Sequence, residues 1–218
     1  MTPGYPITLD LAGRLVLVVG LGLVGTRKAI GLVAAGARVV GVDPGPGVEA
    51  PTGVEHRAEP FRGDHLEGAA LAFAAATPEV NRLVVAEARG RGVWVNAASD
   101  PELGDFALPA TRRDGPVTLA VSTGGASPAL ARSLCDRAAG AIAGSGALAG
   151  LLAELRPIAI ARRADPEARR RLLASWGEAR WLDLLAEGGP GAVRSAWLSA
   201  LASEGGGDSD LRAAGGMS

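Results

Sequence analysis

Residues 14–25, RLVLVVGLGLVG, join an apolar run to a turn that contains three glycines. The run from Arg14 to Val19 is apolar at every position after the arginine and predicts a buried strand. Gly20 would make the tight turn, Gly22 would let the backbone approach a ligand, and Gly25 would allow close helix–sheet packing. This GxGxxG spacing is typical of turns that place a dinucleotide pyrophosphate on the first N–H groups of a helix. We therefore predict a cofactor-binding turn made of Gly20, Leu21, Gly22, Leu23, Val24 and Gly25.

An acidic residue follows this turn at the distance that a dinucleotide site requires. Asp43 ends the second predicted strand, 18 residues after Gly25. A carboxylate there hydrogen-bonds the adenine ribose hydroxyls and repels a 2′-phosphate, so we predict NAD rather than NADP. We assign Pro44, and Ala76 and Thr77 after the fourth predicted strand, to the same cofactor site. The alternative is that these are ordinary turn glycines and a surface aspartate.

The first half of the chain alternates strand-like and helical patterns. Helices are predicted from Val24 to Ala35, closed by Gly36, and from Pro78 to about Arg89, with Thr77 as N-cap. The predicted strands are 14–19, 38–42, 54–58, 71–75 and 93–95. Strands separated by helices at these intervals indicate βαβ units. The predicted fold class is therefore α/β, with a Rossmann-type doubly wound parallel sheet.

The pattern changes after residue 100. We predict a turn at 112–115, a strand at Val117–Val121 and an alanine-rich helix to about Ile142, followed only by helices. Three tryptophans of the last part are predicted to form the core of a small helical domain: Trp176, Trp181 and Trp197. The predicted organisation is a Rossmann domain at 1–110, a central region at 111–148, a helical C-terminal domain at 149–203 and a disordered tail at 204–218.

Composition excludes several classes of protein. The 218 residues have a formal net charge of −1 and 21% charged residues, so the sequence predicts no nucleic-acid partner and no membrane surface. All apolar runs are shorter than the ~18 residues that a spanning helix needs. One cysteine, Cys135, favours a reducing compartment, and we expect a cytoplasmic protein with a buried, inert thiol. His56 and His65 have no partners at metal-ligand spacing, which predicts surface histidines and no metal site.

A short polar loop follows the fifth predicted strand. Asn96-Ala97-Ala98-Ser99-Asp100 would lie at the carboxyl edge of the sheet, where ligands of open α/β folds bind. A nicotinamide ring that reaches across that edge would lie near Asp100, which makes this residue a candidate acid or base. The local alternative is that Asp100-Pro101 only starts a turn.

A second glycine-rich turn joins a strand to a helix. In Ser122-Thr123-Gly124-Gly125-Ala126-Ser127-Pro128, Ser127 is the predicted N-cap and Pro128 the first helical residue. Backbone N–H groups and hydroxyls at such a helix start suit an anionic ligand, and Arg132 lies one turn further along. An ordinary capped helix is the alternative.

Further short motifs follow in a fixed order along the chain: Pro6-Ile7-Thr8-Leu9, Thr26-Arg27-Lys28, Ala74-Ala75-Ala76-Thr77, Val95-Asn96, Asp100-Pro101-Glu102-Leu103, Asp105-Phe106, Pro109, and Val121 to Pro128. Together with the glycine turn they resemble the precorrin-2 dehydrogenase family, the N-terminal module of siroheme synthases. The resemblance covers about residues 6–145. It implies the oxidation of precorrin-2 to sirohydrochlorin with NAD, and in some members the insertion of ferrous iron.

The resemblance also implies site residues and an assembly. The family's functional aspartate corresponds to Asp100, whereas the aspartate that precedes it in many members is Ser99 here. Region 111–148 would form a homodimer and bind the tetrapyrrole. Because precorrin-2 carries eight carboxylates, we expect its pocket to offer N–H groups, hydroxyls and arginine. The predicted substrate-binding residues are Asn96, Ser122, Thr123, Gly124, Gly125, Ser127 and Arg132.

Three hypotheses follow for the activity. The first is an NAD-dependent precorrin-2 dehydrogenase. The second is a bifunctional form that is also a sirohydrochlorin ferrochelatase. The third is a catalytically silent module that binds NAD or a tetrapyrrole, and Ser99 is the feature that favours it.

Overall fold

The computed structural model describes residues 4–202, which form two units. Unit 1 contains the described residues up to Leu108 together with Gly124–Ala126. Unit 2 contains Pro109–Thr123 and the described residues from Ser127 onward. The predicted disordered tail, 204–218, lies outside the described residues.

Unit 1 is built on a parallel five-stranded sheet. Its strands are β1 (Leu15–Val19), β2 (Arg38–Val42), β3 (Val54–Arg57), β4 (Leu71–Ala74) and β5 (Trp94–Ala97). They lie in the order β3-β2-β1-β4-β5, so the direction of winding reverses between β1 and β4. In doubly wound sheets this reversal opens the crevice in which ligands bind. The predicted Rossmann-type sheet is therefore confirmed.

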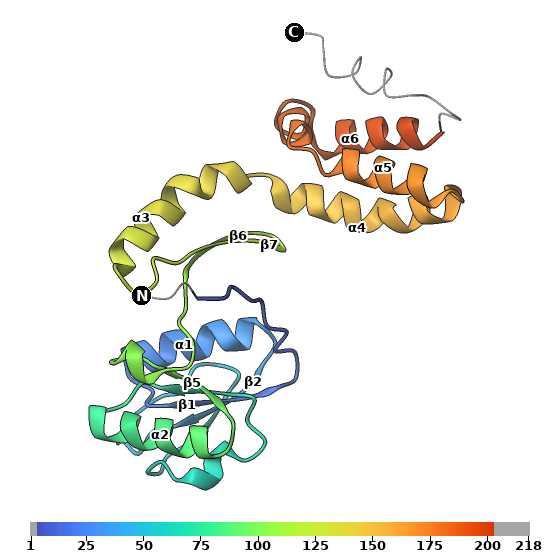
Figure 1. Cartoon of the computed structure of the whole chain (residues 1–218). Coiled ribbons are helices and arrows are strands. Elements are labelled where there is room, and N and C mark those ends of the chain that lie inside the picture. Colours follow the sequence, from blue (N-terminus) through green and yellow to red (C-terminus); the bar gives the residue numbers. More distant parts are fainter. Residues whose placement is uncertain (1–3, 203–218) are drawn as a thin grey trace. The chain divides into compact units, whose positions relative to one another are not determined.

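The two long helices of unit 1 cover opposite faces of the sheet (Figure 1). Helix α1 (Leu23–Ala34) packs Ala29 and Leu32 on the face that contains Val16 and Val18. Helix α2 (Pro78–Gly90) covers the other face, where its apolar residues meet the other side chains of β1. Because successive side chains of a strand point to opposite faces, a strand covered on both sides must be apolar throughout.

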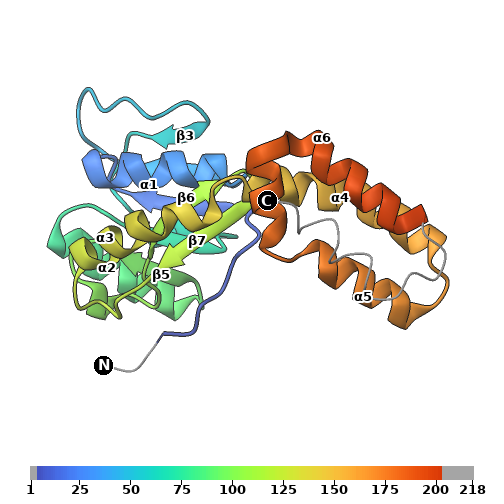
Figure 2. The same cartoon turned by 90° about the horizontal axis from the view of Figure 1, so that it is seen from above.

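Unit 2 combines a hairpin with a helical region (Figure 2). The hairpin strands are β6 (Ala110–Asp114) and β7 (Val117–Val121), which pair in antiparallel fashion. The helices are α3 (Pro128–Ala138), a 3₁₀ turn (Ala139–Ile142), α4 (Ser145–Arg162), α5 (Pro166–Trp176) and α6 (Arg180–Ala202), which is interrupted at Gly189.

The predicted turn at 112–115 is wrong in extent. Arg112–Asp114 belong to β6, where Arg112 pairs with Leu119 and Asp114 with Val117. The chain turns at Gly115, which has φ +53°. Pairing with an apolar neighbour strand stabilises the polar residues of β6 in the extended form, and local composition does not report that pairing.

Three tryptophans form the centre of the helical region, as predicted. The indoles of Trp176 and Trp197 are stacked with their centroids 5.0 Å apart, and Trp181 meets Trp197 edge-on at 5.7 Å. All three are buried. Trp176 is the last residue of α5, and Gly177 follows it as the C-cap.

His65 contradicts the prediction that both histidines lie on the surface. Its side chain is buried, with Nδ1 accepting the N–H of Arg62 at 3.1 Å and Nε2 lying 3.0 Å from Oε1 of Glu59. The polar residues around it in the sequence form its hydrogen-bond partners. A polar sequence context therefore does not imply exposure here.

Among residues 4–202, no single helix has both the length and the apolar composition needed to cross a membrane. One pair bent by 52°, Pro128–Ile142 with Ser145–Arg162, meets that test jointly by length and composition alone.

Candidate functional site

The glycine turn after β1 has two positions that only glycine fits. Gly20 has φ +89°, and a Cβ on it would lie 2.5 Å from the carbonyl oxygen of Ala75. A Cβ on Gly25 would lie 1.8 Å from the carbonyl oxygen of Gly20. A Cβ on Gly22, in contrast, would meet no atom of residues 4–202 within 4 Å. Gly20 and Gly25 therefore allow close backbone packing, while Gly22 faces open space.

The amino end of α1 fits the pyrophosphate of a dinucleotide. Gly22 is its N-cap and provides no side-chain cap, and the first turn contains no acidic residue. Leu23 is 91% exposed. Behind this end, the hydroxyl of Thr26 donates to the carbonyl of Leu21 at 2.8 Å and braces the turn. Uncapped N–H groups at the positive end of a helix are a suitable site for an anion.

Asp43 lies next to this turn, as predicted. Its Oδ2 accepts the N–H of Leu21 at 2.7 Å, and its Oδ1 accepts the N–H of Gly45 at 2.8 Å. The carboxylate thus ties the end of β2 to the glycine turn. Each carboxylate oxygen can accept a second hydrogen bond, which leaves capacity for ribose hydroxyls. Pro44 is exposed beside it.

The loop after β4 contains the other two predicted cofactor residues, and it is held by Asn81 of α2, a residue that was not predicted. Thr77 is the N-cap of α2, and Ala76 precedes it. The buried Asn81 accepts the N–H of Ala76 with Oδ1 at 2.9 Å, and its Nδ2 donates to the Oγ of Ser99 at 2.9 Å. Asn81 could have been found from the helical spacing, because it lies three residues before Val84 on the buried face of α2.

Asp100 follows β5 at the same carboxyl edge of the sheet. Asp100 is exposed. Its backbone carbonyl accepts the N–H of Leu103 at 3.1 Å, at the start of a 3₁₀ turn (Pro101–Leu103). Within residues 4–202 its carboxylate makes no hydrogen bond and no ion pair. The structure therefore leaves this side chain available to a ligand.

Asn96 is buried, and its amide is used within unit 1. Its Oδ1 accepts from Nζ of Lys28 at 2.9 Å, and its Nδ2 donates to the carbonyl of Phe106 at 2.8 Å. This chain of contacts links α1 to the segment after β5. Contact of Asn96 with a substrate stays a prediction.

Lys28 is the single lysine of the sequence. Its Nζ lies 5.3 Å from the centroid of the Phe73 ring. Burial lowers the pKa of its ammonium group, and the neighbouring charge of Arg27 lowers it further. Both effects disfavour the charged form.

A single lysine allows this pKa to be measured directly. We expect Lys28, reductively methylated with ¹³C, to titrate at lower pH in the folded chain than in the same chain unfolded in guanidinium chloride. Carbon-detected NMR over an alkaline pH series measures both values. Equal values would contradict the half-buried placement of the ammonium group.

The second glycine-rich turn belongs to unit 2 at both of its ends. The Oγ1 of Thr123 accepts the N–H of Ser127 at 3.1 Å and donates to the carbonyl of Ser127 at 3.0 Å, so this hydroxyl closes the turn. Gly124 and Gly125 have positive φ, and Ser127 caps α3 through the N–H of Leu130.

The remaining two predicted substrate-binding residues of this region are Arg132 and Ser122. Arg132 is exposed in the first half of α3, and Ser122 follows β7. The prediction that the turn contacts a substrate stays a prediction for all of its residues.

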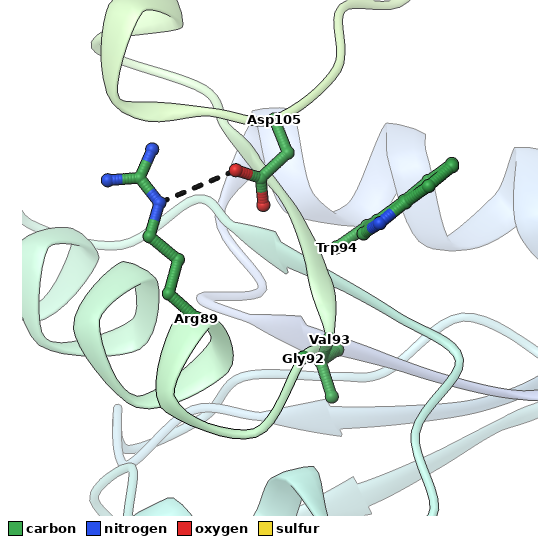
Figure 3. A pocket seen from close by; sticks show the side chains of 5 residues that line it. All are labelled: Arg89, Gly92, Val93, Trp94 and Asp105. Atoms are coloured by element: carbon green, nitrogen blue, oxygen red, sulfur yellow. Dashed lines mark hydrogen bonds and ion pairs between the residues drawn. The ribbon is translucent and has the colours of Figure 1, made fainter.

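Two cavities of unit 1 lie away from the predicted site. One, of about 320 Å³, is lined by Arg89, Gly92, Val93, Trp94 and Asp105 (Figure 3). The other, of about 200 Å³, is lined by Leu15, Arg38, Val40, Glu55, Arg57, Asp64, His65 and Glu67. Trp94 begins β5, so the first cavity lies toward the amino ends of the strands. The second cavity extends from Leu15 and Arg38, which begin their strands, to Arg57, which ends β3. Ligands of doubly wound folds bind at the carboxyl edge, where the glycine turn and Asp100 lie.

Two family models match consecutive parts of the chain. A model described as "Putative NAD(P)-binding" matches residues 7–110, and one described as "Sirohaem biosynthesis protein central" matches residues 114–134. The first match supports the predicted nicotinamide cofactor without distinguishing NAD from NADP.

Curated relatives and a solved structure agree with these models. A siroheme synthase of Chromobacterium violaceum is 37% identical over 208 residues, which cover 92% of this chain and 44% of the relative. A siroheme synthase of Nitrosomonas europaea is 42% identical over 140 residues, 61% of this chain and 29% of the relative. The structure of "SirC, precorrin-2 dehydrogenase" matches with a TM-score of 0.68 and 23% identity, covering 91% of this chain and 98% of that one, and shows the same fold.

The chain spans less than half the length of the two curated relatives. Both family models match in the order expected from the sequence motifs, and the relatives carry the name that the resemblance predicted. The resemblance to the precorrin-2 dehydrogenase family, the N-terminal module of siroheme synthases, is therefore confirmed.

Proposed function

We propose that this chain catalyses the NAD-dependent oxidation of precorrin-2 to sirohydrochlorin in siroheme biosynthesis. The observation that carries the proposal is the shared edge of unit 1: the open amino end of α1 follows β1, and the unpaired carboxylate of Asp100 follows β5. The names of the curated relatives support the pathway, and the name of the matched solved structure supports the reaction.

The cofactor would be held by backbone groups and one carboxylate. The first N–H groups of α1 bind the pyrophosphate, with Gly22 leaving room for its approach. Asp43 accepts hydrogen bonds from the ribose hydroxyls while it keeps its bonds to Leu21 and Gly45. NAD, when bound, supplies the acceptor for a hydride.

Asp100 would act as the general base. The oxidation removes two electrons and two hydrogen nuclei from the macrocycle, one leaving as hydride and the other as a proton. The exposed carboxylate of Asp100 has no competing partner among residues 4–202 and can take that proton.

The carboxylates of precorrin-2 would be bound by the second glycine-rich turn and by α3. The turn from Ser122 to Ser127 offers backbone N–H groups in front of α3, and Arg132 adds a positive charge on the same helix. Arginine and helix-start N–H groups are the partners that carboxylates prefer. We also propose a homodimer, formed through the region 111–148.

A direct assay tests the proposed reaction. Precorrin-2 and NAD are added to the full chain under anaerobic conditions, and NADH is followed at 340 nm. We expect protein-dependent NADH and sirohydrochlorin in equal amounts. Binding of both ligands without NADH would instead indicate a silent binding module. Iron insertion stays a separate prediction, tested by siroheme formation from sirohydrochlorin and ferrous iron.

Asp43→Asn tests the choice of cofactor. We expect the parent chain to use NAD well and NADP poorly, because the Asp43 carboxylate repels a 2′-phosphate. The amide loses the charge and presents an N–H₂ group toward a backbone N–H, so kcat/KM for NAD should fall by roughly ten- to hundredfold. The ratio of kcat/KM for NAD to that for NADP should fall as well, which initial rates with each nucleotide measure. A ratio equal to that of the parent chain would exclude this role of Asp43.

A further inference from the structure

We propose that Asn81 and Ser99 form a positioning pair that fixes the loop of Asp100 relative to the loop after β4. The inference rests on the proposed function, since it assigns to the pair an effect on the turnover step. Asp100 is adjacent to Ser99 in the chain, and Ala76 belongs to the predicted cofactor site. The pair thus connects the candidate base with the cofactor loop.

Asn81 is the buried centre of this connection. Its side chain is 2% exposed and makes three hydrogen bonds: from the N–H of Ala76 to Oδ1 at 2.9 Å, from Nδ2 to the carbonyl of Ala76 at 3.2 Å, and from Nδ2 to the Oγ of Ser99 at 2.9 Å. A backbone N–H can only donate, so Ala76 fixes which end of the amide is the oxygen. The Nδ2 group must therefore face Ser99.

The loop of Asp100 is held at its two ends by different contacts. At its far end, Asp105 bonds twice to Val95: its backbone N–H donates to the carbonyl at 2.8 Å, and its Oδ2 accepts the N–H at 2.9 Å. At its near end, the N–H of Ala98 donates to the carbonyl of Ala74 at 2.9 Å, and Ser99 adds the bond to Asn81. Ser99 provides the last side-chain contact before Asp100.

In the contact with Asn81, the side chain at position 99 must accept a hydrogen bond. A serine hydroxyl accepts from Nδ2 of Asn81, and a threonine hydroxyl or a carboxylate oxygen can do the same. An alanine cannot. The serine of this chain therefore meets the requirement.

Three variants of the full chain test the pair. Ser99→Ala removes the acceptor, Ser99→Thr keeps it, and Arg82→Ala is a matched control, because Arg82 is the exposed neighbour of Asn81 on α2. Ser99 is itself exposed, so its substitution does not disturb the core. The measurements are kcat, KM for NAD and KM for precorrin-2, together with hydrogen exchange of the peptide 98–104.

We expect Ser99→Ala to lower kcat about tenfold, because a misplaced catalytic group slows the turnover step, and to leave KM for NAD within about twofold. Its loop amides should exchange faster than in the parent chain. Ser99→Thr should recover most of the lost kcat and the slow exchange, and Arg82→Ala should match the parent chain in both. Equal losses in Ser99→Ala and Ser99→Thr, or parental kcat and exchange in Ser99→Ala, would overturn the proposal.

Failure of the proposed function is separable from failure of the pair. If the parent chain produces no NADH, the dehydrogenase proposal fails and kcat cannot be compared. Hydrogen exchange then still decides whether Asn81 and Ser99 hold the loop: faster exchange in Ser99→Ala alone supports the pair, and equal exchange in all variants refutes it.

Discussion

Asp100→Asn is expected to bind NAD as tightly as the parent chain and to lose turnover by about 10²–10⁴-fold, the range for removal of a general base. The amide has nearly the shape of the carboxylate, so folding should be unaffected. Because the Asp100 side chain makes no hydrogen bond or ion pair within residues 4–202, no structural contact is lost with its charge.

Calorimetric titration of NAD and the rate of NADH formation from precorrin-2 separate the two effects. Glu102→Gln is the matched control, since Glu102 is exposed in the same loop and the same change of charge there should leave the rate unchanged. Turnover of Asp100→Asn equal to that of the parent chain would remove Asp100 from the mechanism. A drop of the same size in both variants would indicate a general effect of negative charge on this loop.

The sheet could be predicted because the apolar residues of its central strands indicate that these strands are buried on both faces. β1 is apolar at every position since both of its faces are covered, and β2 matches its predicted bounds for the same reason. The predicted turn at 112–115 failed where that signal is missing. Arg112 is extended because it pairs with Leu119, a neighbour whose influence is not visible in the residues around Arg112.

Parts of the candidate site were predictable from backbone requirements, and others depend on contacts between distant segments. The glycine turn could be predicted from its three glycines. Two of them must be glycine, because a side chain on Gly20 would collide with Ala75 and a side chain on Gly25 would collide with Gly20. The bond between Asn81 and Ser99 joins residues 18 positions apart, and Lys28 meets Asn96 across 68. Spacing along the chain does not predict such pairs. The one local indication is a polar residue on the apolar face of a helix, such as Asn81 on α2, because a buried polar side chain needs a hydrogen-bond partner.

A chain in which Gly25 is replaced by alanine is expected to lose stability in unit 1. The new Cβ would lie 1.8 Å from the carbonyl oxygen of Gly20, which is backbone and cannot rotate away. Overpacking of this kind costs about 3 kcal/mol or more, equivalent to roughly 6–12 °C in the Tm of a chain of this size. Differential scanning calorimetry measures the loss, and a parental Tm would mean that α1 lies further from β1 than described.

Gly22→Ala should have the opposite pattern of effects. Its backbone, at φ −64° and ψ −173°, suits alanine, and no atom of the described part of the chain lies within 4 Å of the new Cβ. The Tm should therefore stay at the parental value. The methyl group would project into the space in front of α1 where the pyrophosphate is expected. Affinity for NAD should then fall at least about tenfold, a loss of ~1.4 kcal/mol. Calorimetric titration measures that affinity, and parental NAD binding by Gly22→Ala would mean that the nucleotide does not approach α1 through this space.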